Sequence, residues 1–110
     1  MGISTHILDT SRGRPAEGVT VNLSVWQDGN WAELARGVTN PDGRVKPLLE
    51  TISAAGVYRL SFEVAPYFAR LGIDSFYPAV SVEFRVNVPS EHYHVPLLLN
   101  PFGYSTYRGS

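Results

Sequence analysis

The chain has 110 residues, of which 44% are hydrophobic, which is enough for one domain with a buried core. Nine basic and ten acidic side chains give a formal net charge of -1, and without long runs of like charge the chain is a poor candidate for binding nucleic acid or an anionic membrane. It contains no cysteine, which excludes disulfide bonds, thiolate zinc sites and a cysteine nucleophile.

Alternation of apolar and polar residues predicts β-strands along most of the chain. The alternation is most regular in residues 19–25 and 80–86, and Asp28-Gly29-Asn30 and Asn40-Pro41-Asp42-Gly43 are typical turn sequences. We therefore expect an antiparallel sandwich of about seven or eight strands. In chain order, the strand patterns that can be delimited span residues 3–8, 19–25, 31–38, 57–64, 80–86 and 92–99.

One segment after the fourth of these strands breaks the alternation. Residues 66–72 begin with Pro66, which suits the first turn of a helix, and end with Gly72, which suits its termination. This pattern predicts a single short helix. No repeat, low-complexity tract or internal linker interrupts the sequence, so we expect residues 1–110 to form one domain.

The three histidines are the first candidates for chemistry. Alternation places His6 on the same strand face as Ser4, and His92 and His94, which are two residues apart, share a face of their own strand. Arg44 follows a predicted turn, and the N–H donors of its planar guanidinium group could bind adjacent carbonyl oxygens. Taken singly, each of these residues is more often an ordinary surface residue than a catalyst.

Three kinds of chemistry fit these residue types to different degrees. Two histidines in a His-x-His pair could bind zinc, but the spacing does not bring His6 to them and the sequence has no HExxH helix. No Gly-x-Ser-x-Gly turn supports a serine nucleophile. General acid–base catalysis by histidine, whose ordinary pKa of roughly 6.5 is close to neutral pH, needs only two imidazoles and one arginine as anchor. We favour this last interpretation.

The C-terminal residues do not resemble a usual domain end, which is polar and poorly ordered. An apolar strand is followed by Phe102, Tyr104 and Tyr107, and the last residue, Ser110, carries both a hydroxyl and a carboxylate. This composition predicts that the tail is packed against the domain.

These residues together resemble the 5-hydroxyisourate hydrolase branch of the transthyretin-like family, and the resemblance covers nearly the whole chain. The terminal tetrapeptide Tyr107-Arg108-Gly109-Ser110 resembles the one that marks the hydrolases and that the hormone-carrying transthyretins lack. Two longer blocks carry the rest of the resemblance: His6-Ile7-Leu8-Asp9 with Gly13, Pro15, Ala16, Val19 and Val21, and Tyr93-His94-Val95-Pro96 continuing through Asn100-Pro101-Phe102-Gly103-Tyr104-Ser105.

The resemblance implies both an architecture and a site. The architecture is a transthyretin-like sandwich of two four-stranded antiparallel sheets with one short helix, assembled as a homotetramer with sites at the dimer–dimer interface. The site has His6, Arg44 and His94 as catalytic residues, and His6, Arg44, Tyr107 and Ser110 as substrate-binding residues. The hormone carriers have lysine in place of His6 and threonine in place of His94, so both positions indicate an enzyme.

The predicted function is the opening of the 5-hydroxyisourate ring in urate degradation, without metal or cofactor. The main alternative is a non-catalytic tetramer that binds a small aromatic ligand, and a second is an adhesive sandwich in which the histidines are incidental.

We expect a soluble cytoplasmic protein, because the sequence has no membrane span, no secretion signal and no peroxisomal Ser-Lys-Leu end. The sequence leaves open the role of His92 and which histidine is the base.

Overall fold

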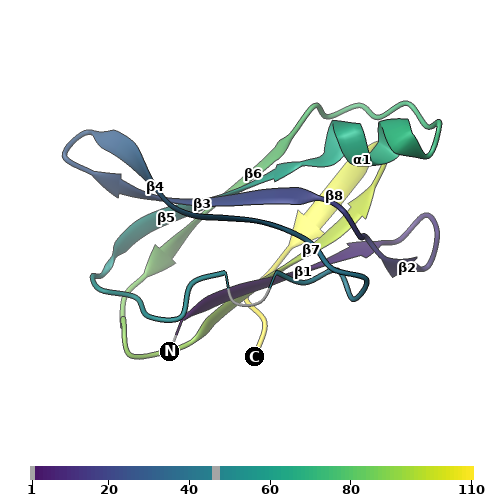
Figure 1. Cartoon of the computed structure of the whole chain (residues 1–110). Coiled ribbons are helices and arrows are strands. Elements are labelled where there is room, and N and C mark those ends of the chain that lie inside the picture. The colour runs from purple at the N-terminus through teal and green to yellow at the C-terminus, as the bar shows by residue number, and fades with distance from the viewer. Residues whose placement is uncertain (1, 46–47) are drawn as a thin grey trace.

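The structure is a computed structural model that describes residues 2–45 and 48–110. Two four-stranded sheets pack face to face, as predicted, with one short helix at an end of the sandwich (Figure 1). The elements are β1 (Ile3–Asp9), β2 (Arg14–Pro15), β3 (Thr20–Gln27), β4 (Asn30–Val38), β5 (Gly56–Glu63), α1 (Val64–Arg70), β6 (Val80–Val86), β7 (Tyr93–Asn100) and β8 (Gly103–Thr106). One sheet has the order β2-β1-β7-β8 and the other the order β4-β3-β5-β6.

The core lies between the two sheets and is filled by alternate residues of their strands. Side chains such as Ile7, Leu23, Phe62 and Leu97 are completely buried there. The intervening residues of the same strands face away from the core, as the period of two requires. Each of the six strand patterns delimited in the sequence corresponds to an observed strand, with ends that differ by at most two residues. The two shortest strands, β2 and β8, had no delimited pattern.

Helix α1 begins two residues before the predicted segment. Val64 is its first residue and Pro66 its third, a position where the amide N–H that proline lacks would have no partner within the helix. The helix ends at Arg70, and its side chains Tyr67 and Phe68 are buried against the core. No helix in the described part of the chain is both long and apolar enough to cross a membrane.

One strand pair departs from the expected antiparallel arrangement. β1 and β7 run parallel, with Ser4 opposite His94 and His6 opposite Pro96, whereas the other pairs among the described strands are antiparallel. The chain passes through the whole second sheet between β1 and β7, and parallel neighbours require such a crossover because a tight hairpin cannot join them.

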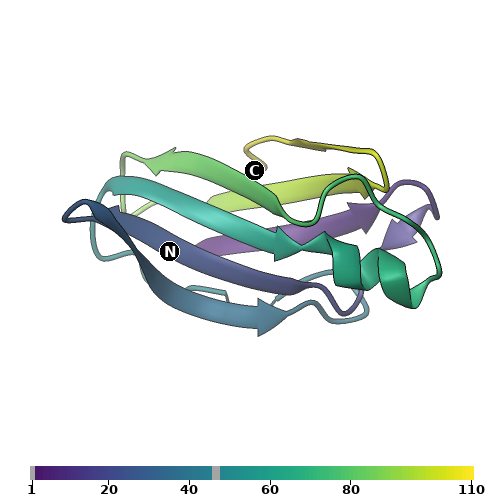
Figure 2. The same ribbon diagram turned by 90° about the horizontal axis from the view of Figure 1, so that it is seen from above.

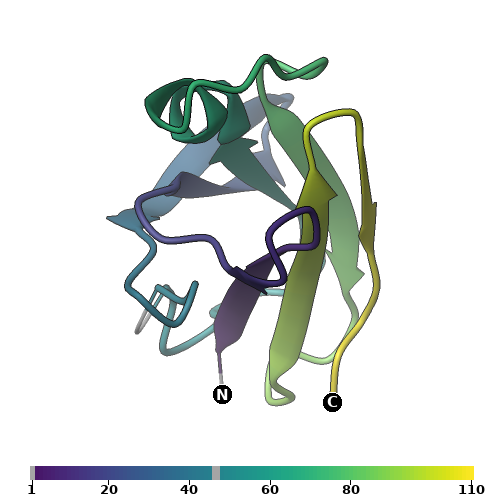
Figure 3. The ribbon, with the colours of Figure 1, turned by 90° about the vertical axis from the view of Figure 1, so that its right-hand side faces the viewer.

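The start of β1 and the C-terminus lie on the side of the sandwich away from helix α1 (Figures 1 and 3), and the helix lies at one end of the two packed sheets (Figure 2). After β8 the C-terminal tail, residues 107–110, runs back beside β7 towards the start of β1 (Figure 3). The first half of β1, the first half of β7 and the tail therefore meet in one region of the molecule.

Candidate active site

His6 and His94 lie on the outer face of the sheet β2-β1-β7-β8. Odd-numbered residues of β1 are buried in the core, whereas even-numbered ones, including Ser4 and His6, are only partly buried. In β7, His94 is likewise partly buried between the buried residues Tyr93 and Val95. Because Ser4 is opposite His94, the two histidines are diagonal neighbours on adjacent strands.

Arg44 is brought to His6 by the turn that precedes it. The Asn40 side chain organises this turn, since its Oδ1 accepts hydrogen bonds from the backbone N–H groups of Asp42, at 2.9 Å, and Arg44, at 3.1 Å. The turn attaches to β1 through a hydrogen bond of 2.8 Å from the Ile7 N–H to the Gly43 carbonyl. An isolated antiparallel bridge then pairs Arg44 with His6.

Gly43 is required for this close attachment. Its φ is +75°, a conformation that other residues rarely adopt, and a Cβ at this position would overlap the carbonyl oxygen of Ile7. The predicted turn sequence therefore fixes the position of the Arg44 backbone beside β1.

Replacing Asn40 with alanine tests the role of the turn. We expect a loss of about 1–2 kcal/mol of unfolding free energy, because two backbone N–H groups lose their acceptor. Catalytic efficiency should also fall, since Arg44 is held less firmly beside His6. Chemical denaturation and a turnover assay measure the two effects. Asn30→Ala, at the first residue of β4, is the matched control, and equal effects of both substitutions would contradict the assignment.

Both histidines of the pair are electrostatically disposed to be neutral. Burial lowers the pKa of His6, and the charge of Arg44 lowers it further, with a smaller opposing contribution from Asp42. Burial also lowers the pKa of His94, followed by the charges of Arg44, His6 and His92, against a hydrogen bond with the backbone of Ser4. An imidazole that is neutral at neutral pH can accept a proton, so either ring can act as a base.

The influence of Arg44 on both rings can be measured by NMR titration. In Arg44→Gln, the pKa values of His6 and His94 should rise towards the ordinary value, since a positive neighbour is removed. Because the pKa values of both histidines are lowered in the folded state, the unfolded chain binds more protons than the folded chain as the pH falls below about 6.5. The free energy of unfolding should therefore decrease below this pH, and the decrease should be smaller in Arg44→Gln. Arg36→Gln, on the exposed strand β4, is the control. Unchanged histidine pKa values in Arg44→Gln would show that the guanidinium does not face them.

The C-terminal tail is attached to β7, as predicted, but not through the aromatic side chains on which the prediction rested, since Phe102 and Tyr107 are largely exposed. The Gly109 N–H donates a hydrogen bond of 2.8 Å to the His94 carbonyl, and the two residues form an isolated bridge. A Cβ on Gly109 would lie 2.6 Å from Cδ2 of the His94 ring. Only glycine therefore allows the tail backbone to lie against the imidazole.

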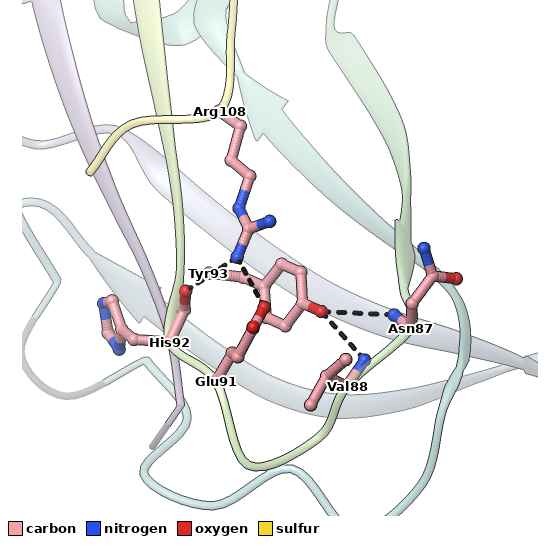
Figure 4. Close-up of polar contacts among 6 residues, drawn as sticks. All are labelled: Asn87, Val88, Glu91, His92, Tyr93 and Arg108. Carbon is pink, nitrogen blue, oxygen red and sulfur yellow. Dashed lines mark hydrogen bonds and ion pairs between the residues drawn. The ribbon is translucent and has the colours of Figure 1, made fainter.

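Arg108 fastens the tail to the turn that precedes β7 (Figure 4). Its Nη2 donates to the Glu91 carboxylate at 3.2 Å and to the His92 carbonyl at 3.3 Å. Its guanidinium carbon lies 4.2 Å from the centre of the Tyr93 ring, whose hydroxyl accepts hydrogen bonds from two backbone N–H groups of the same turn. Arg108 thus holds the tail where Gly109 meets His94.

The structure brings some of the predicted site residues together and leaves others apart. His6, Arg44 and His94 are neighbours. Tyr107 instead lines a groove of about 260 Å³ beside β6 and is 58% exposed, and Ser110 follows Gly109 directly and is exposed. Within residues 2–45 and 48–110, no hydrogen bond joins either of these two side chains to the histidines or to Arg44.

Sequence reasoning did not predict the contacts that two residues make with His94. One is Gly109, which was named only as part of the terminal tetrapeptide. The other is Ser4, whose Oγ lies 2.7 Å from Nδ1 of His94 and 2.8 Å from Nε2 of His92. Alternation placed Ser4 on the face of His6, but only the register between β1 and β7 places it beside His94. Across the described ranges, no group of three or more histidine, cysteine or carboxylate side chains could hold a metal ion.

Comparisons with known proteins place these residues in a family context. The sequence model of the HIUase/Transthyretin family matches residues 3–109. A 5-hydroxyisourate hydrolase of Halalkalibacterium halodurans is 51% identical over 115 residues, which cover 98% of this chain and 97% of the relative. The structure of Klebsiella pneumoniae 5-hydroxyisourate hydrolase matches with a TM-score of 0.85 at 44% identity, covering 98% of each chain. Sea bream transthyretin in complex with thyroxine matches with a TM-score of 0.91 at 34% identity, covering 97% of this chain and 93% of that one. The fold is thus common to a hydrolase and a thyroxine-binding protein, and the site has to distinguish them.

Proposed function

This chain belongs to the HIUase/Transthyretin family, and we propose that it hydrolyses 5-hydroxyisourate to 2-oxo-4-hydroxy-4-carboxy-5-ureidoimidazoline in urate degradation. The observation that carries the proposal is the convergence of His6, Arg44 and His94 on one face of the sheet. A hormone carrier has no need of two neutral imidazoles beside a guanidinium. Relatives that bear the name 5-hydroxyisourate hydrolase support the same choice.

In the proposed mechanism, Arg44 binds carbonyl oxygens of the flat substrate and polarises them. His94 takes a proton from water as the oxygen attacks a ring carbonyl, and this proton is returned to the departing ring nitrogen with the neutral ring of His6 as the relay, which gives one proton and regains another. The lowered pKa of His94 suits it to the role of base. The ring opens without a covalent bond to the protein.

Tyr107 and Ser110 are proposed to fix one edge of the substrate. This role rests on the resemblance of the terminal tetrapeptide to that of the hydrolases. Attachment of the tail at His94 through Gly109 supports it for Ser110, which is the next residue. For Tyr107, which lines the groove beside β6, the resemblance is the only support.

We also propose a cytoplasmic homotetramer with sites at the dimer–dimer interface. The site lies on an outer sheet face, which a second copy could cover, and β6 and β8 are edge strands that could pair with those of another copy. Light scattering after gel filtration should give about four times the 12.1 kDa of one chain. A mass of one chain in an active preparation would contradict the assembly.

The test of function uses freshly generated 5-hydroxyisourate, whose ultraviolet absorbance decays slowly by itself. The proposal predicts faster decay with added protein and the same rate in excess EDTA, since no step needs a metal. A non-catalytic carrier would instead bind an aromatic ligand and leave the decay at its spontaneous rate. Loss of activity in EDTA that zinc restores would contradict metal independence.

A further inference from the structure

Ser4 connects two histidines that belong to different environments. Its Oγ is hydrogen-bonded to Nδ1 of His94 at 2.7 Å and to Nε2 of His92 at 2.8 Å. His94 is partly buried beside Arg44, whereas His92, which directly precedes β7, is exposed. The three side chains therefore form a continuous chain of hydrogen bonds from the candidate site to the protein surface.

The number of protons shared by these three side chains limits which ring nitrogens can carry one. A serine hydroxyl has a single proton, so it can donate to only one of the two rings, and the other ring must donate to Oγ. When Ser4 donates to His92, Nδ1 of His94 carries a proton and Nε2 of His94 is free to act as a base. When Ser4 donates to His94, Nε2 of His94 carries the proton and can act only as an acid.

We propose that Ser4 and His92 form a proton relay that serves His94, an inference that rests on the proposed hydrolase function. As Nε2 of His94 removes a proton from the attacking water, the Nδ1 proton moves to Oγ of Ser4, and the Ser4 proton moves to Nε2 of His92. The hydroxide oxygen bonds to the substrate carbonyl, His94 remains neutral, and His92 becomes the cation. When the ring nitrogen departs, the protons return along the same hydrogen bonds to Nε2 of His94, and His6 relays a proton from there to the nitrogen, so no proton is gained or lost.

The charges around the two rings favour this displacement of the positive charge. A cation on His94 would face Arg44 and His6, both of which lower its pKa. A cation on His92 is exposed to water, and the neighbouring Glu91 and Arg108 bind each other. Transfer of the positive charge from His94 to His92 through Ser4 therefore separates it from the positive charge of Arg44, which is needed to bind the substrate.

Ser4 and His92 act through His94, so they are positioning residues, and kinetics can separate them from the binding machinery. In Ser4→Ala and in His92→Gln, which keeps an amide but cannot take up a proton, kcat should fall between about ten- and a hundredfold, as expected for a hydrogen bond to a group that becomes charged. KM should stay unchanged, because neither residue binds substrate. Ser4→Thr keeps the hydroxyl and should restore kcat, and Ser81→Ala, at an exposed position of β6, is the control. An unchanged kcat in both Ser4→Ala and His92→Gln would overturn the relay while leaving the hydrolase proposal intact.

A second measurement does not depend on turnover. Nitrogen-15 NMR distinguishes the Nδ1–H from the Nε2–H form of a neutral histidine. In the wild-type chain, protonation of His92 makes its Nε2 a donor, which turns the Ser4 hydroxyl towards His94 and should switch His94 to the Nε2–H form. In Ser4→Ala and His92→Gln this switch should be absent. If the position of the His94 ring proton responds to pH identically in the wild type and in Ser4→Ala, the relay is wrong. If the switch occurs in a wild-type chain that has no activity, the relay is supported and the proposed hydrolase function is refuted.

Discussion

Replacing His94 with asparagine is expected to lower kcat/KM for 5-hydroxyisourate by about 10²- to 10⁴-fold, the usual contribution of a positioned acid or base. Asparagine can still form hydrogen bonds to Ser4, but it cannot take the proton of the attacking water. The folded structure should persist, because the side chain faces outward and the core residues on either side remain. The absorbance decay gives the rate, and circular dichroism monitors the fold.

Asn100→Ser is the matched control for this substitution. Asn100 lies on β7 and is partly buried like His94. We expect Asn100→Ser to keep full activity. Full activity in His94→Asn would remove this residue from the mechanism and, with it, the role of Arg44 as its electrostatic partner.

Removing residues 107–110 is expected to reduce activity by about a hundredfold or more with little change in stability. The truncation removes the Gly109 backbone that lies against the His94 ring, and a small displacement of a reacting group can cost that much in rate. The lost contacts of Arg108 are mostly exposed, and exposed ion pairs contribute at most about 1 kcal/mol. Thermal unfolding should therefore change by only a few degrees.

An extended C-terminus provides a complementary test of the tail. A tag added after Ser110 keeps every contact of Arg108 and Gly109 but adds bulk beside the proposed pocket. We expect lower activity with an unchanged melting temperature, and an N-terminal tag on a long linker is the comparison. A truncated chain that turns over substrate at the full rate would show that the tail is not part of the site.

The fold could largely be predicted because its signals are local. The alternation in β3 and β6 and the Asp28-Gly29 turn between β3 and β4 depend on neighbours in sequence, and all three appear as expected. The parallel pairing of β1 with β7 could not be predicted, because it depends on how a long crossover returns. The two-residue strand β2 is too short to show any alternation.

The site was predictable as a list of residues but not as an arrangement. His6 and His94 stood out by residue type and Arg44 by the turn before it, and the resemblance implied their catalytic roles. The contact of Ser4 with both histidines depends on the register of strands about ninety residues apart, and no local pattern encodes it. The close approach of Gly109 to His94 also depends on tertiary packing, although a glycine in an otherwise bulky tail was a signal that could have been used.

The rate of loss of freshly formed 5-hydroxyisourate, followed by ultraviolet absorbance at several protein concentrations, tests the central claim most directly. The proposed function predicts a rate that rises in proportion to the concentration of the full chain and returns almost to the spontaneous rate with His94→Asn at the same concentrations. Decay at the spontaneous rate for the folded, full-length chain at every concentration would contradict it.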